Sequence, residues 1–165
     1  MDSLHTVFKS TLLAGNPVLI LPIIVIILIC AASSIYYRRP FWKTLSKRTS
    51  VIIVTLLLFQ MWFLGTQLIT YKNVVVAYQM GEYETVIGQV QEYKPPSTNL
   101  NPWESFSVDG VSFSYGGGEC RNYFGFDKTS INGGPITQNG LFVRVSYVVY
   151  DGKNIIVQLD IIDVE

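Results

Sequence analysis

The stretch WESFSVDGVSFSY, residues 103–115, decides the fold of the C-terminal half of this chain. Apolar residues alternate with serines on both sides of Asp109–Gly110, a dipeptide that favours the two-residue type I′ turn of a β-hairpin. The predicted apolar face consists of Phe106, Val108, Val111, Phe113 and Tyr115, and the polar face of Ser105, Ser107, Ser112 and Ser114. Such alternation is typical of an antiparallel sheet with one face in a core and the other in solvent.

A second hairpin is predicted further along the chain. Residues 141–150 and 154–162 alternate in the same way on either side of Asp151–Gly152, and residues 84–93 indicate one more strand. Five strands in this order predict a small all-β domain, for which an OB-like, partly open barrel is one candidate.

Two long apolar runs precede this domain. The chain is 49% hydrophobic and only 15% charged, whereas soluble domains carry about 25% charge. Residues 18–37 and 50–70 contain no charged side chain. As helices rising about 1.5 Å per residue, both are long enough for a hydrocarbon core of about 30 Å. The sequence therefore predicts two transmembrane helices.

The segment between these runs is basic. It carries five positive charges and no acid: Arg38, Arg39, Lys43, Lys47 and Arg48. The positive-inside rule places such a loop in the cytoplasm, with both termini outside. The prediction is an α+β membrane protein that crosses the membrane twice. Its parts are a two-helix hairpin over residues 1–71 with a cytoplasmic loop at 38–49, a stalk at 72–82 and an extracytoplasmic β domain at 83–165.

Gln60 and Gln67 are the strongly polar residues inside the second run, and they are two helical turns apart. They are candidates for a membrane-helix contact, either with a partner or with the first helix of the same chain. Neither run contains an Asp, Glu, Lys, Arg or His residue, which disfavours a self-sufficient transporter. A small accessory subunit of a transporter stays open as an alternative.

The C-terminal part is acidic. From Lys72 onward there are six basic and eleven acidic residues, a net charge of −5. A negative domain repels phosphate backbones, so nucleic acid is not an expected partner.

Few residues in the predicted domain could carry out catalysis. The only histidine is His5, outside that domain, so neither a Ser-His-Asp site nor a His-ligated zinc site is expected there. No metal or cofactor is predicted. Cys120 could form an intermolecular disulfide or be an inert, half-buried thiol. Four acids, Glu104, Asp109, Glu119 and Asp127, leave a carboxylate-based hydrolase acting on envelope polymers as an alternative.

Aromatic residues gather around the glycine-rich segment 116–139: Trp103, Tyr115, Tyr123, Phe124 and Phe126. They could form a binding platform, or they could cap the core. The core role is favoured for Tyr115 and Phe126. The candidate ligand- or partner-binding residues are therefore Trp103, Tyr123 and Phe124, with Arg121 and Glu104 beside them.

A resemblance covers residues 81–162. It rests on Gly88–Gln89–Val90, Glu104 to Val108, Phe113 to Tyr115, Gly125–Phe126, Gly133 to Ile136, Gly140, Val143–Arg144 and Asn154 to Ile156. In these positions the chain resembles a widespread group of small, uncharacterised bacterial inner-membrane proteins with a C-terminal extracytoplasmic β domain. The resemblance implies the fold of the domain, its place beside membrane helices and a location in the bacterial inner membrane, but no activity.

The sequence as a whole predicts a non-catalytic integral membrane protein. Its external β domain would bind a partner protein or an envelope ligand, as an assembly or accessory subunit. The expected partners are the lipid bilayer, a membrane or envelope protein, or a second copy of the chain.

Overall fold

A computed structural model describes residues 3–10, 27, 47–97 and 102–163. The chain divides into two compact units. One, called here the β unit, combines residues 1–16 with residues 70–165, and the other spans residues 17–69.

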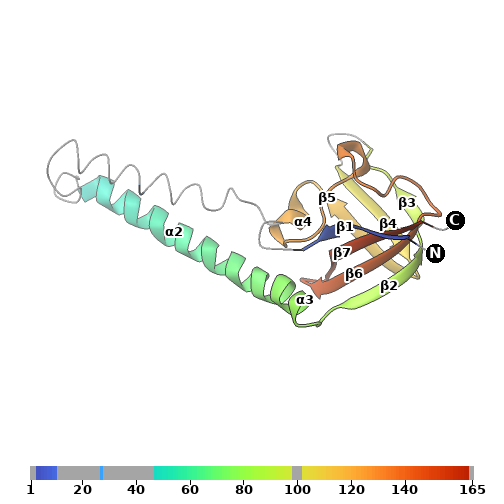
Figure 1. The fold of residues 1–165 in the computed structure, drawn as a ribbon. Helices are drawn as coiled ribbons and strands as arrows, with labels where there is room; N and C mark the ends of the chain where they lie inside the picture. The colour runs from blue at the N-terminus through green and yellow to red at the C-terminus, as the bar shows by residue number, and fades with distance from the viewer. Residues whose placement is uncertain (1–2, 11–26, 28–46, 98–101, 164–165) are drawn as a thin grey trace. The chain divides into compact units, whose positions relative to one another are not determined.

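Within the described residues, seven strands form two antiparallel sheets (Figure 1). The four-stranded sheet has the order β1 (Ser3–Lys9), β7 (Lys153–Asp163), β6 (Phe142–Tyr150) and β2 (Glu84–Gln89). The three-stranded sheet has the order β3 (Gln91–Lys94), β4 (Trp103–Val108) and β5 (Val111–Gly116).

Both predicted hairpins are confirmed. In the first, β4 and β5 pair with Phe106 opposite Phe113. In the second, β6 and β7 pair through Tyr150 and Lys153. Each turn has positive φ at both central residues, with Asp109 at +48° and Gly110 at +79° in the first. These angles are those that a type I′ turn requires.

The strand expected over residues 84–93 is two strands, one in each sheet. β2 pairs with β6, β3 pairs with β4, and Val90 separates the two strands. Val90 is 1% exposed, and its backbone N–H donates to the carbonyl of Leu141. The chain thus crosses from one sheet to the other at a residue that is itself part of the core.

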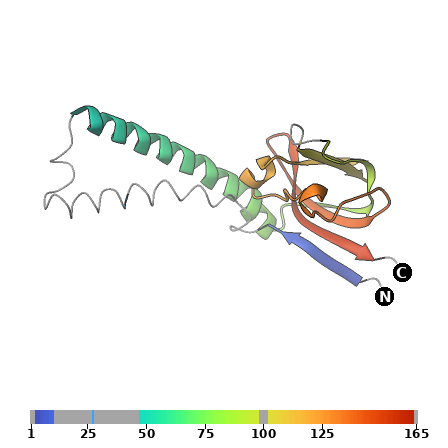
Figure 2. The same cartoon turned by 90° about the horizontal axis from the view of Figure 1, so that it is seen from above.

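The prediction of five strands is wrong for a second reason as well, because an N-terminal strand joins the four-stranded sheet. β1 lies beside β7, with Ser3 opposite Asp163 and Lys9 opposite Gln158 (Figure 2). The start of β1 therefore lies next to the end of β7. Pairing with a strand more than 140 positions away leaves no local pattern of the kind that a hairpin leaves, so it was not predicted.

The membrane prediction is also contradicted. In the described part of the chain, no helix combines the length and the apolar character needed to cross a bilayer. This finding overturns the two transmembrane helices, the two-pass topology and the inner-membrane location. The second apolar run falls in α2 (Lys47–Tyr71), which begins with two basic residues and includes Gln60 and Gln67. The first run, residues 18–37, lies outside the described residues except for Ile27.

The helical segment after α2 belongs to the core of the β unit. A π-helical turn, η4 (Lys72–Val76), leads into α3 (Ala77–Gln79). Val74 and Val75 are fully buried, and Val74 packs with Tyr78, Val148 and Ile155. Most of the apolar side chains of η4 are therefore buried within the protein.

The main core lies between the two sheets. Its buried members include Phe106, Phe113, Tyr115, Val145 and Leu159. The segment between β5 and β6 contributes Cys120, Phe126 and Ile136 to the same cluster, and it contains two short helices, α4 (Glu119–Asn122) and η5 (Ser130–Asn132). The core roles predicted for Tyr115 and Phe126 are confirmed, at 1% and 3% exposure.

Candidate binding site

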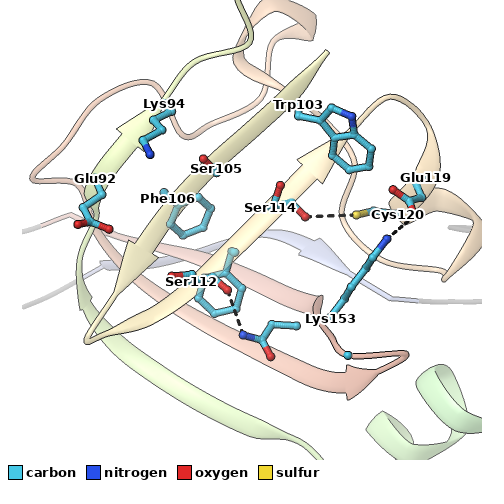
Figure 3. Close-up of a pocket in the computed structure, with 13 residues that line it drawn as sticks. Glu92, Lys94, Trp103, Ser105, Phe106, Ser112, Ser114, Glu119, Cys120 and Lys153 are labelled. Carbon is cyan, nitrogen blue, oxygen red and sulfur yellow. Dashed lines mark hydrogen bonds and ion pairs between the residues drawn. The ribbon is translucent and has the colours of Figure 1, made fainter. Parts of the chain in front are cut away.

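The outer face of the three-stranded sheet forms a hollow of about 520 Å³, called here the serine hollow. Figure 3 shows Trp103, Glu119 and Lys153 at one end of it and Glu92 and Lys94 at the other. Between the two ends lie the serines of β4 and β5, Ser105, Ser112 and Ser114. A volume of this size falls in the range of small-molecule sites, roughly 300 to 1,000 Å³.

The alternation of β4 and β5 produces this face. Phe106 and Phe113 are paired and point into the core, at 2% and 1% exposure. Ser105 and Ser114 are paired and point outward with Ser112. Lys94 of β3 lies opposite Ser105, which brings a positive charge to the same face. Among the described residues, the hydroxyls of these three serines have no hydrogen-bond partner.

Trp103 is the exposed aromatic residue of the hollow, with 37% of its surface in solvent. It pairs with Gly116, where φ is +125° and a Cβ would lie 2.2 Å from the carbonyl oxygen of Pro102. A Cβ on Gly117 would lie 3.9 Å from the indole, so the ring rests beside the glycine backbone. The local chain therefore needs glycine at position 116, and this places the ring at the mouth of the hollow.

The charges at the Trp103 end are paired. Lys153 donates a hydrogen bond to Glu119 and forms a salt bridge with it, which raises the pKa of Lys153. The same ammonium lies 5.6 Å from the centre of the Tyr123 ring. Lys153 is placed here by the Asp151–Gly152 turn, directly before β7.

The structure separates the predicted binding residues. Phe124 is 5% exposed, and its ring lies 5.6 Å from that of Tyr71. Tyr123 is half-buried, with its ring 5.8 Å from that of Tyr150. Arg121 is exposed and lines a different hollow, of about 640 Å³, next to β1. Of the three aromatic candidates, Trp103 alone lines the serine hollow.

Glu104 faces the interior. It is fully buried, its Oε1 accepts a hydrogen bond of 2.5 Å from the Tyr115 hydroxyl, and its Oε2 accepts one of 2.7 Å from the backbone N–H of Ser130. Burial has the larger effect on the pKa of Tyr115, and the hydrogen bond to Glu104 adds to it. Together they raise this pKa above its ordinary range. Both carboxyl oxygens are engaged in tying η5 to β4, so Glu104 supports the fold.

Asp127 and Cys120 organise the glycine segment beside Trp103. The carboxylate of Asp127 accepts a hydrogen bond of 3.0 Å from the N–H of Gly116, and burial raises the pKa of this acid. Cys120 is 5% exposed, and burial raises the pKa of its thiol to about 12. A neutral thiol is a poor nucleophile, so the inert role fits Cys120 better than disulfide exchange.

The remaining acids are also engaged structurally. Asp109 occupies the β4–β5 turn and Glu119 pairs with Lys153. In the described part of the chain, no group of three or more His, Cys, Asp or Glu side chains could hold a metal ion.

Gln60 and Gln67 both lie in α2 and are partly exposed. The Oε1 atom of Gln67 is buried and has no hydrogen-bond partner among the described residues. The first predicted helix, which was one possible partner, lies outside those residues.

Sequence reasoning missed most of the serine hollow. It identified the serine face and Trp103 separately, but not Glu92, Lys94, Lys153 or Asn154, which also line the hollow. The polar alternation of β4 and β5 indicates the serine face, but not that Lys94 and Lys153 lie at its two ends. No local signal shows that a turn of one sheet approaches the face of the other.

Comparison of the chain with protein-family models, with curated proteins and with solved structures finds no match. The resemblance of residues 81–162 to small bacterial inner-membrane proteins therefore stays a prediction.

Proposed function

We propose that the β unit is a non-catalytic binding module and that the serine hollow is its binding face. The observation that carries the proposal is an exposed, positioned indole at the end of a hollow whose serine hydroxyls have no hydrogen-bond partner among the described residues. In this role the chain is an accessory or assembly subunit, which recruits a ligand or partner for a larger process.

The partial exposure of the Trp103 side chain supports a binding role. The indole leaves 37% of its surface in solvent, and this part of its apolar area does not contribute to folding. Aromatic residues of this kind dominate the energy of many interfaces. Because Gly116 and Gly117 position the ring before any ligand arrives, binding would order few additional groups.

The engaged acids support a non-catalytic role. General acid–base catalysis needs a group that can reach the substrate and exchange a proton near the working pH. Glu104 is buried and doubly hydrogen-bonded, and the thiol of Cys120 has a pKa of about 12. These states suit structural roles and weigh against the hydrolase alternative.

Site-specific photocrosslinking in native cells tests this proposal. A benzophenone amino acid at Ser112, which is exposed in the hollow, should give one defined adduct, identified by mass spectrometry. The same label at Ile87, which is 53% exposed on β2, is the matched control and should not give that adduct. Trp103→Ala should remove the adduct at Ser112. An adduct that persists in Trp103→Ala, or that forms equally from Ile87, would refute the serine hollow as the binding face.

A further inference from the structure

We propose that the serine hollow takes a neutral saccharide, with one sugar ring stacked on Trp103 and its hydroxyls bonded to the serines. This inference rests on the proposed function, because it names the ligand class of the same face. Three features of the hollow carry it: its charge balance, its aromatic ring and the kind of polar group on its floor.

The charges of the hollow balance. Its lining contains two acids, Glu92 and Glu119, and two bases, Lys94 and Lys153. Glu119 and Lys153 already neutralise each other in a salt bridge. A polyanion would meet both carboxylates and a polycation both ammonium groups, so like-charge repulsion opposes each of them. The face therefore suits an uncharged, strongly polar ligand.

Trp103 supplies an apolar surface at one end. The face of an aromatic ring carries partial negative charge, and one face of a pyranose presents only C–H groups, whose hydrogens are slightly positive. Stacking these two faces removes apolar area from water on both partners. The indole keeps 37% of its surface in solvent and rests beside Gly117, so it is available without rearrangement.

The floor supplies hydroxyl groups. Each serine hydroxyl can donate one hydrogen bond and accept two, which matches the mixed donor and acceptor character of sugar hydroxyls. Ser105, Ser112 and Ser114 have no protein partner among the described residues. A rigid aromatic anchor with short, adaptable hydroxyls is a combination that also serves in antibody binding sites.

A peptide strand fits this face less well. The hollow lies on the face of the sheet, where the backbone N–H and C=O groups of central β4 already pair with β3 and β5. An extended peptide laid there would find few backbone partners, and unpaired backbone groups are costly to bury. A saccharide has no such obligatory backbone groups.

Isothermal titration of the purified full chain tests the ligand class. The probes are tetrasaccharides of β-linked glucose, α-linked glucose, N-acetylglucosamine and mannose, with a sulfated glucose tetrasaccharide as the anionic comparison. At least one neutral probe should bind with a Kd of about 1 mM or tighter, and more tightly than the sulfated probe.

Variants locate the binding. Trp103→Ala should weaken the neutral probe by about tenfold or more, and Trp103→Tyr should retain much of the affinity because it keeps a ring. Ser112→Ala and Ser114→Ala change outward hydroxyls and should weaken binding severalfold without altering the melting temperature. Trp62→Ala is the matched control, since Trp62 is 65% exposed and outside the hollow, and it should leave the affinity unchanged.

The outcomes separate this inference from the proposed function. If no neutral probe binds, or if the sulfated probe binds best, the saccharide inference is overturned. The binding face itself would then stand only if the Ser112 adduct still forms and still depends on Trp103. If neutral binding survives Trp103→Ala, both the saccharide geometry and the assignment of this face are wrong.

Discussion

The Tyr115 hydroxyl donates a hydrogen bond of 2.5 Å to Glu104 Oε1, and neither side chain is more than 1% exposed. The other carboxyl oxygen, Oε2, accepts from the backbone of Ser130. One buried acid thus joins two strands of the hairpin to the segment that follows it. This connection fixes the underside of the sheet whose outer face is the serine hollow.

Tyr115→Phe should lower the free energy of unfolding by about 1 to 3 kcal/mol, because it leaves a buried carboxyl oxygen without its donor. Urea unfolding followed by circular dichroism measures this change. Tyr83→Phe is the control: Tyr83 is 41% exposed, and removing its hydroxyl should change stability by less than about 0.5 kcal/mol. Equal effects of the two variants would contradict the structural role of the Glu104 contact.

Cys120 should resist alkylation in the folded protein. Raising a thiol pKa from 9.0 to about 12 lowers the thiolate fraction near pH 8 by about a thousandfold, and burial limits access further. Mass mapping of the peptide that contains Cys120 after iodoacetamide treatment should show slow modification at pH 8 and fast modification in urea. Rapid modification of the folded chain would contradict the buried, inert thiol.

Gly116→Ala should destabilise the β unit by about 2 kcal/mol or more and misplace Trp103. The new Cβ would lie 2.2 Å from the Pro102 carbonyl oxygen at a φ of +125°, which side chains rarely adopt. Gly65→Ala is the control, because a Cβ there meets nothing within 4 Å and alanine favours a helix. In thermal unfolding, Gly116→Ala should therefore lower the melting temperature, and Gly65→Ala should leave it unchanged or raise it.

Pairing of β1 with β7 should allow a disulfide between His5→Cys and Ile161→Cys. These residues are Cα partners in the ladder, and antiparallel partners lie about 4.5 to 5.5 Å apart, within the range a disulfide spans. Peptide mass mapping without reductant checks the bond. Val149→Cys, on β6 opposite Asn154, should not pair with His5→Cys. Failure of the first pair with success of the second would contradict the register of β1.

Local sequence signals predicted the parts of the fold that are local. The Asp109–Gly110 and Asp151–Gly152 turns defined two hairpins, because the turn chemistry and the alternation lie within a dozen residues of each other. Pairing of β1 with β7 and of β2 with β6 depends on distant partners. No window of sequence contains both sides of those ladders.

The environment of an apolar residue depends on tertiary structure, which a sequence pattern does not show. A hydrophobic run indicates that side chains leave water, but not whether lipid or protein receives them. Val74 and Val75, counted as part of a stalk, are fully buried in protein. Within the binding site, the type and the sequence neighbours of Trp103 indicate a binding residue, whereas the places of Lys94 and Lys153 in the hollow follow from tertiary structure.

Fluorine NMR of the full chain labelled with 5-fluorotryptophan tests the central claim that ligand binds at Trp103. The chain has three tryptophans, so the Trp103 resonance can be assigned with Trp103→Phe. Titration with the neutral tetrasaccharides should shift or broaden the Trp103 resonance and leave those of Trp42 and Trp62 unchanged. The account would be contradicted if the Trp103 resonance stayed fixed, whether another tryptophan responded or none did.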